Sequence, residues 1–186
     1  ECYSDDHCPS GYYCAADHTC RQSGTSAAPV KTGKFWTEME AGVAHIFKFV
    51  KEGIGITQLN ITIKNPARNV RISIERIEEK PEGLPEIKGK VYQYVEIKVE
   101  NLSEENIESA FIRFNVSKSW VAENNLDKNR IFLYRFVNDS WQKLETELLE
   151  EDDYFIYEAK TPGFSYFAIV GETLVCEEGA KRCVDN

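Results

Sequence analysis

The feature that most constrains this chain is a repeated alternation of apolar and polar residues with a period of two. Successive side chains of a β-strand point to opposite faces of the sheet, so this period is typical of strands with one buried and one solvated face. Such strands usually pair in an antiparallel manner, and we therefore predict a mostly β chain. The alternating apolar positions are Leu59, Ile61 and Ile63; Val70, Ile72 and Ile74; Val95, Ile97 and Val99; and Ile112, Phe114 and Val116.

The rest of the chain between residues 34 and 172 continues this pattern of short strands separated by turns. One short helix is expected at 117–125, where Ser117 or Ser119 could cap its first turn. About ten strands in all indicate an antiparallel β-sandwich of two facing sheets, with a barrel as the alternative. The further strands are predicted at 35–39, 42–50, 131–138, 141–148, 154–160 and 164–170, with tight connections at 138–140 and 150–153.

Four of the six cysteines lie in the first 20 residues, each separated from the next by five residues. The segment 1–22 is too small to bury a core, so we predict a knot held by disulfides. Zinc is the less favoured alternative because close CxxC pairs are missing. Three disulfide pairings of these four remain open. The cysteines are Cys2, Cys8, Cys14 and Cys20, and further along the chain Cys176 and Cys183.

Segment 23–33 is small and polar with Gly and Pro, and we interpret it as a flexible linker. Disulfides also indicate an extracellular location, in which case residue 1 is expected to be a processed or trimmed start. The formal charge of −9 argues against nucleic acid and anionic membranes as partners. No apolar run approaches the roughly 18 residues of a membrane helix, so direct membrane insertion of this segment is not expected.

Four Asn-X-Ser/Thr tripeptides support secretion. Each asparagine falls on the outward side of a predicted strand, at a strand end or in a turn, where a glycan has room. Outward strand positions are polar in any case, which is the alternative explanation. The predicted glycosylation sites are Asn60, Asn101, Asn115 and Asn138.

A search for chemistry finds no nucleophile, metalloprotease or nucleotide-binding motif, so we predict that the chain is not an enzyme. His7 and His18 lie in the knot, where a metal site is a minor alternative, and His45 is expected to be a hydrogen-bonded strand residue. The acidic run 150–153 could bind calcium but lacks the spacing of a dedicated loop, so a solvated hairpin tip is favoured and no cofactor is predicted. A sugar-stacking platform could be built from Trp36, Trp120 and Trp141.

Three sequence blocks carry a family resemblance: YRF at 134–136, WQKL at 141–144 followed by Thr146, and TPGFSYFAI at 161–169. On these blocks, residues 34–172 resemble the PGF-pre-PGF domain of secreted and cell-surface proteins of archaea. The resemblance implies an extracellular domain, often joined to other surface modules and tethered at the cell envelope, without a defined activity. Segment 1–22 is similar to small cysteine-rich repeats of such proteins, and 173–186 looks like the start of a second one.

The block TPGFSYFAI also has a physical interpretation. Pro162 fixes φ and Gly163 permits unusual φ values, so the pair is predicted to make a sharp entry into the last strand. Large rings at Phe164, Tyr166 and Phe167 would then lie on both faces, which is typical of a central strand.

These observations predict a non-enzymatic, extracellular structural or adhesion module of the cell surface, such as a filament or envelope subunit. Its partners would be other surface proteins or copies of itself, contacted through exposed strand edges. One alternative is a carbohydrate-binding module of a larger secreted protein, with glycans as ligands. Another is a protein-binding or protease-inhibitor knot at 1–22 carried by the β domain. Abundant Glu, Lys, Ile and Val with a single Met suggest a thermophilic source.

Overall fold

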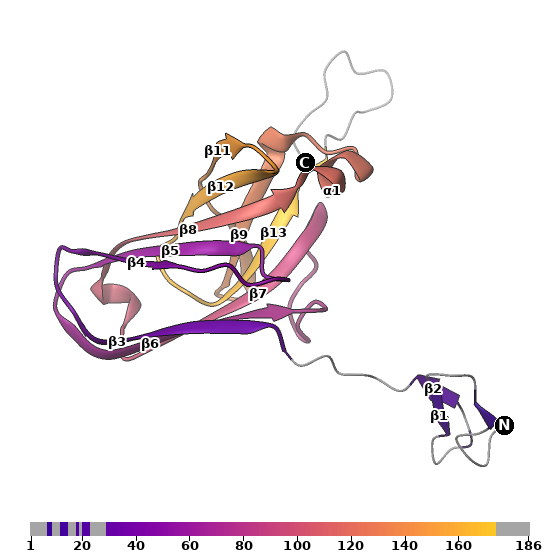
Figure 1. The fold of residues 1–186 in the computed structure, drawn as a ribbon, viewed down its shortest axis with the longest axis horizontal. Coiled ribbons are helices and arrows are strands. Elements are labelled where there is room, and N and C mark those ends of the chain that lie inside the picture. The colour runs from indigo at the N-terminus through magenta and orange to yellow at the C-terminus, as the bar shows by residue number, and fades with distance from the viewer. Residues whose placement is uncertain (1–6, 9–11, 15–17, 19, 23–28, 174–186) are drawn as a thin grey trace.

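A computed structural model describes residues 7–8, 12–14, 18, 20–22 and 29–173 (Figure 1). Near the N-terminus, β1 (Tyr12–Cys14) and β2 (Cys20–Gln22) form a small antiparallel pair. A disulfide joins Cys8 to Cys20. Only one of the three pairings that the sequence leaves open contains this bond. Cys14 is disulfide-bonded as well. The other predicted disulfide cysteines, Cys2, Cys176 and Cys183, lie outside the described residues.

The main body is a mostly β, antiparallel sandwich, as the alternation predicts. One sheet has six strands in the order β10-β9-β13-β7-β6-β3, and the other has five in the order β11-β12-β8-β5-β4. Figure 1 shows the two sheets as facing layers. The strands are β3 (Lys31–Met39), β4 (Ala44–Lys48), β5 (Ile56–Ile63), β6 (Ala67–Ile77), β7 (Lys90–Glu100), β8 (Ile107–Ser117), β9 (Ile131–Val137), β10 (Ser140–Lys143), β11 (Thr146–Glu151), β12 (Tyr154–Lys160) and β13 (Tyr166–Gly171).

The core lies between the two sheets and is made of the predicted apolar positions. Eleven of the twelve are at most 1% exposed, and only Val99 remains partly exposed. Phe114 of β8 stacks on Tyr157 of β12 with ring centroids 5.3 Å apart. The last strand, β13, lies between β7 and β9, which confirms the prediction of a central strand.

The short connections follow the expected chemistry. The predicted helix is α1 (Lys118–Glu123), and the Ser117 hydroxyl accepts a hydrogen bond from the backbone N–H of Trp120 at 3.1 Å. Asn138 and Asp139 have φ values of 49° and 57°, as a two-residue hairpin turn requires. Two 3-10 turns, η2 (Glu104–Asn106) and η3 (Lys128–Arg130), precede β8 and β9. None of the helices in the described residues has the length and apolar character of a membrane span.

Two predicted boundaries were wrong. The single strand expected at 141–148 is two strands, β10 and β11, that belong to different sheets. The chain crosses between the sheets at Leu144, whose N–H still donates to the oxygen of Leu133 at 2.9 Å, while the next oxygen, that of Glu145, accepts from Lys160 in the other sheet. In addition, β3 starts at Lys31, so the last three residues of the predicted linker 23–33 are strand.

Position 163 requires glycine for a different reason from the one predicted. Its φ lies outside the positive region, so an unusual backbone angle is not what requires glycine. A Cβ atom built at this position would instead collide with the carboxylate of Glu104. That carboxylate accepts a hydrogen bond from Arg135, whose side chain is only 4% exposed. Gly163 therefore leaves room for the partner of a buried cation.

Candidate functional site

The side of the sandwich where β3 and β4 run is the least covered part of the fold. Each of these strands is the last in its sheet and is paired on one side only. Trp36 of β3 meets Phe47 of β4 edge-to-face, with ring centroids 6.3 Å apart, so these rings lie between the two strands. Beyond these rings, the backbone edges of β3 and β4 face solvent.

The edge strand β3 is long and largely solvent-accessible. It contains nine residues, and those that are exposed are Lys31, Gly33, Lys34, Phe35, Thr37 and Glu38. Its pairing with β6 runs from Lys31 opposite Glu75 to Met39 opposite Ala67 without a register shift. An edge strand of this kind presents unpaired backbone groups to solvent.

The hydrogen-bond phase of β3 follows from the residue before it. The N–H of Arg76 donates to the oxygen of Val30 at 2.9 Å, so Val30 and Arg76 form a hydrogen-bonded pair. In an antiparallel ladder such pairs alternate, so this phase holds as far as Trp36 opposite Val70. Beyond Trp36 the ladder is irregular, because Thr37 and Asn69 are not paired and Asn69 has a φ value of 54°. The N–H and C=O groups of Gly33 and Phe35 point towards the free edge.

The other three edge strands carry features that oppose further pairing. β10 has four residues and β4 has five. β11 has six, but its ladder is interrupted between Leu148 and Glu150, and it carries Glu147, Glu150 and Glu151. Shortness, bulges and charge are the usual means of protecting an edge. Among the described edge strands of the two sandwich sheets, β3 is the longest.

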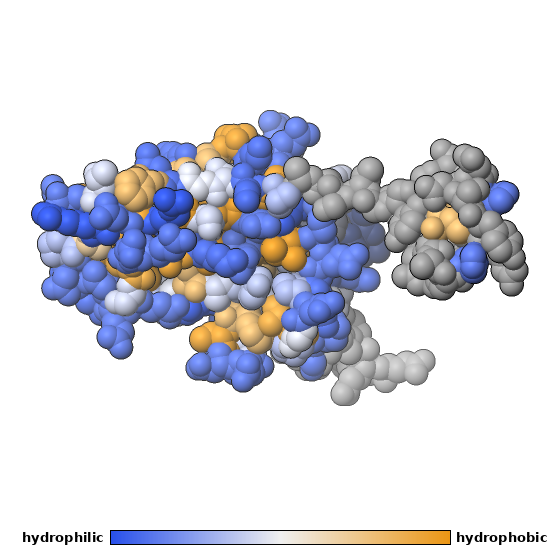
Figure 2. All heavy atoms as spheres, turned by 90° about the horizontal axis from the view of Figure 1, so that it is seen from below, coloured by the Kyte–Doolittle hydropathy of each residue, from blue (hydrophilic) through white to orange (hydrophobic). Residues whose placement is uncertain are grey.

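Apolar side chains are exposed on β3, on β4 and just before and after β4. Six large hydrophobic residues are exposed in the described part of the chain, and four of them lie between residues 35 and 50. Val50 is 99% exposed and Ile46 is 51% exposed. Figure 2 shows that hydrophobic patches interrupt the largely hydrophilic surface on the face it presents. The four are Phe35, Val43, Ile46 and Val50.

A recess of about 510 Å³ lies at the loop that joins β4 to β5. The Gln93 amide holds that loop with both of its ends: its oxygen accepts from the Gly55 N–H and its nitrogen donates to the Gly53 oxygen, each at 2.7 Å. Tyr92 and Asn115 also line the recess. No histidine or cysteine is among the described residues that line it, so the recess lacks the groups that most often act as nucleophile and base.

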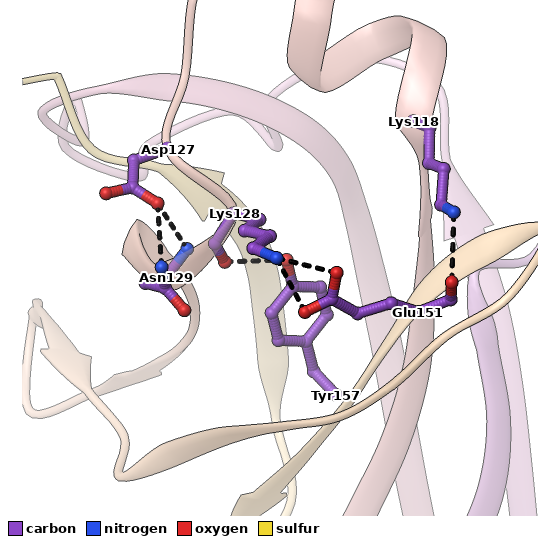
Figure 3. A network of polar contacts seen from close by, with 6 residues as sticks. All are labelled: Lys118, Asp127, Lys128, Asn129, Glu151 and Tyr157. Carbon is purple, nitrogen blue, oxygen red and sulfur yellow. Dashed lines mark hydrogen bonds and ion pairs between the residues drawn. The ribbon is translucent and has the colours of Figure 1, made fainter.

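The predicted acidic run lies at the tip of the β11–β12 hairpin, as expected. Both oxygens of the Glu151 carboxylate accept hydrogen bonds from the Lys128 ammonium group at 2.6 Å (Figure 3). Lys118 donates to the backbone oxygen of Glu151 at 3.0 Å, and the Tyr157 hydroxyl donates to the backbone oxygen of Lys128 at 2.7 Å. This network ties the segment before β9 to the hairpin, and the Glu151 carboxylate is already occupied.

The remaining acids of the run, Glu150, Asp152 and Asp153, are exposed. Among the described residues, no three His, Cys, Asp or Glu side chains gather in a way that could hold a metal ion. His45 Nε2 lies 3.0 Å from the backbone oxygen of Glu40, so it is hydrogen-bonded at the rim, as predicted. His7 and His18 are exposed. Calcium binding therefore stays a prediction, and the described residues contain no cluster of ligands that would support it.

The three tryptophans are not brought together. Trp36 and Trp141 belong to the opposite edge strands of the six-stranded sheet. Trp120 belongs to α1 and packs on Tyr92 with ring centroids 4.9 Å apart. The Trp141 ring lies 5.3 Å from that of Phe136 at an angle of 63°, and its N–H donates to the Pro85 oxygen. The prediction that the three tryptophans could build one sugar-stacking platform is therefore wrong.

The predicted glycosylation sites differ in accessibility. Asn101 and Asn138 are exposed, although Asn101 Nδ2 already donates to the Asn69 oxygen at 2.9 Å. Asn115 and Asn60 are half-buried, and Asn60 Oδ1 is buried without a hydrogen-bond partner in the described structure. Asn138 is therefore exposed in a turn and has no side-chain hydrogen bond among those described, which leaves it accessible to a glycan. Glycosylation itself stays a prediction.

A cluster that the sequence did not indicate fastens the end of β13. The Glu172 carboxylate accepts from the Tyr134 hydroxyl, and it pairs with Lys143 at 2.8 Å and Arg130 at 3.3 Å. Burial raises the pKa of the Tyr134 hydroxyl, and the hydrogen bond to Glu172 raises it further. Because the partners come from η3, β9 and β10, only the folded chain reveals this cluster.

No family model matches this chain, and no match was found among curated proteins or among solved structures.

Proposed function

We propose that this chain is a non-enzymatic, extracellular structural or adhesion module of the cell surface, which works by docking other protein chains. The observation that carries the proposal is the β3 side of the sandwich. There, the nine-residue edge strand β3 has free backbone groups at Gly33 and Phe35, and four large apolar residues between positions 35 and 50 are exposed. Pairing through backbone hydrogen bonds, with side chains giving selectivity, is a common way for one protein to bind another.

The location at the cell surface rests on two further features. The Cys8–Cys20 disulfide belongs to the kind of cross-linked segment that forms under oxidising conditions outside the cytosol. The blocks at 134–136, 141–144 and 161–169 resemble an archaeal surface domain that is often joined to other surface modules. Both features fit a protein that is displayed in an envelope or a surface filament.

A carbohydrate-binding role draws less support. The largest aromatic group on an outer sheet face joins Trp141, Phe136 and Tyr94, and all three rings are half-buried. They are tilted against one another by 36° and 63°, whereas a sugar-stacking platform needs exposed and coplanar rings. An inhibitor role for the knot at 1–22 would depend largely on residues outside the described ones. It stays an alternative that binding screens can test.

The test is negative-stain electron microscopy of the purified 186-residue chain across a concentration series, with and without calcium. Filaments, lattices or discrete oligomers that grow with concentration support the proposal. If the chain remains monomeric throughout and captures no partner from a defined panel of cell-surface proteins, the proposal is wrong. Soluble glycans in the same panel decide whether the carbohydrate alternative should replace it.

A further inference from the structure

We infer that β3 is a force-release strand: when the chain is pulled at both ends, β3 peels away from β6 first and the rest of the sandwich stays folded. This role rests on the proposed function, because a module of a surface assembly carries load between its neighbours. The load enters the sandwich at Val30 and leaves it at Glu172, since residues 1–29 precede the first position and 173–186 follow the second. The order in which strands open then depends on where these two points lie in the six-stranded sheet.

The two points lie at different levels along the strands. Val30 is hydrogen-bonded to Arg76, and Arg76 is paired with Val95. Val95 is in turn paired with Phe167, near the start of β13. Glu172 follows the end of β13, roughly 17 Å further along that strand. Strands β7 and β6 lie between β13 and β3, which adds a sideways separation of about 14 Å. The exit point therefore lies towards the end of the sheet from which β3 runs away.

This geometry loads β3 as a peeling strand. A stretched chain turns until the force lies along the line between the two held points, so the pull on Val30 is directed away from Glu172. It points outward past the free edge of β3 and towards the end to which β3 runs. Only a force in the opposite direction would draw β3 out along its own axis. The backbone bonds to β6 must therefore break one pair after another, starting at Val30 and Arg76.

Few contacts besides these bonds hold the beginning of β3. The strand is paired on one side only, and the exposed residues of its first part are Lys31, Gly33, Lys34 and Phe35. The first apolar anchor is Trp36, which contacts Phe47, and the next is Met39, which is fully buried. Between these anchors the ladder is irregular, because Thr37 and Asn69 are not paired. Each step of the peeling thus breaks few contacts.

The other end of the load is held more firmly. β13 is paired with β7 on one side and with β9 on the other. The pull on Glu172 has its larger component along β13, so the bonds of both ladders are loaded together and divide the force. The Glu172 N–H donates to the Arg130 oxygen at 2.9 Å, and its carboxylate holds Arg130, Lys143 and the Tyr134 hydroxyl. Bonds that break singly yield at a lower force than bonds loaded together, so β3 opens before β13.

The release stops at β4. This strand begins four residues after β3 ends and runs back to the loop at Gly53, whose oxygen accepts from Gln93 of β7. The pull on Ala44 is directed away from Glu172, and therefore outward along β4, so the bonds of β4 to β5 are loaded together. The Gly42 N–H, which donates to the Ile63 oxygen at 2.9 Å, also fastens the turn before β4. The freed segment is thus β3 itself, with a contour length of about 30 Å.

The experiment stretches the full chain in optical tweezers, with handles at its first and last residues. A reversible step that releases about 30 Å of contour length should precede the main rupture and occur at a lower force. Lys31→Cys combined with Glu75→Cys places two thiols at an opposed pair without backbone hydrogen bonds, where the spacing suits a disulfide. Once oxidised, this variant should lack the first step. Ala44→Cys with Thr62→Cys, an equivalent pair of β4 and β5, should keep it. A first step that persists in the oxidised Lys31→Cys, Glu75→Cys chain would overturn the inference.

Two proline variants separate peeling from a general loss of stability. Thr32→Pro removes an N–H that bonds to β6, so the first step should occur at a lower force. Lys31→Pro removes an N–H that points to the free edge, so it should leave that force unchanged. An unchanged far-ultraviolet spectrum shows that both variants fold. Glu172→Gln weakens the opposite end and should not affect the first step. If Glu172→Gln lowers the force of the first step and Thr32→Pro does not, the sandwich opens at β13 and the inference is wrong.

Together with the microscopy and partner capture described above, the stretching data separate this inference from the proposed function. Assembly or partner capture by a chain that ruptures in a single event would overturn the release of β3 and leave the proposed function intact. A first step that the Lys31→Cys, Glu75→Cys disulfide abolishes, in a chain that neither assembles nor captures a partner, would support the opening order and overturn the proposed function. Assembly together with such a step would support both.

Discussion

Glu104→Gln should destabilise this protein more than a change at a half-exposed residue normally does. The Glu104 side chain is 50% exposed, but its partner Arg135 is only 4% exposed and lies in β9, inside the sandwich. Arg135 Nε has no hydrogen-bond partner in the described structure. The buried guanidinium therefore depends on Glu104 for its compensating charge.

The size of the effect follows from this asymmetry. Removing one partner of a fully buried ion pair costs roughly 3–5 kcal/mol, because the other charge stays buried and unpaired. Water reaches Glu104, so the attraction is partly screened and we expect a loss of about 2–3 kcal/mol in the free energy of unfolding. Arg135→Met should cost about 1 kcal/mol or less, because it removes the charge and keeps an apolar stem. Glu104→Gln added to Arg135→Met should then cost little more.

The assay is urea denaturation followed by tryptophan fluorescence, with all variants compared at a common slope m. A double-mutant cycle over Glu104 and Arg135 should give a coupling free energy of about 2 kcal/mol. Gly163→Ala supplies an independent check, because its Cβ would occupy the space of the Glu104 carboxylate. It should destabilise the original chain and have a much smaller effect when residue 104 is alanine. Additive single changes, or a loss below about 0.5 kcal/mol for Glu104→Gln, would refute the reasoning.

Three other predictions use contacts of the described fold. Burial raises the pKa values of the Tyr134 and Tyr157 hydroxyls in the folded chain. Their contribution to stability is therefore complete below about pH 10, the ordinary tyrosine pKa, and is lost as the pH rises towards the folded-state values. Tyr157→Phe should reduce this loss of stability at alkaline pH, measured by denaturation curves. Ser117→Ala should cost about 1 kcal/mol through the lost helix cap, measured by urea denaturation against Ser117→Thr, which keeps the capping hydroxyl. Calcium should leave the melting temperature unchanged because Lys128 already binds the Glu151 carboxylate, and a clear rise would restore the calcium site.

The alternation of apolar residues predicted most of the sandwich because it depends only on which face of a strand is buried. It could not show where the chain changes sheets. Leu144 is 8% exposed at the point of transfer, and Leu148 packs against the same core from the other sheet. Apolar residues are therefore required at the same spacing on both sides of the transfer point. Only the backbone partners of Leu144 and Glu145 reveal that the strand is divided.

The start of β3 was hidden for a different reason. Lys31, Thr32 and Gly33 have the composition of a linker, and no apolar period marks them as a strand. Their place is set by β6, which they pair with in register. A Cβ at Gly33 would lie 2.7 Å from the Ile72 oxygen, so the close approach of β6 favours glycine there. A residue that suggests flexibility in the sequence thus permits a tight strand contact.

The most distinctive sequence block and the candidate contact surface lie in different places, which bears on how such a domain could work. Around Gly163, the Thr161 hydroxyl donates to the Gly163 oxygen at 2.6 Å, and glycine leaves room for the partner of Arg135. The block therefore serves the interior of the sandwich. The free edge of β3 has an ordinary sequence, and its properties come from register, length and exposure. A resemblance carried by such a block can report the scaffold, whereas the proposed docking of other chains would depend on the residues of the β3 edge.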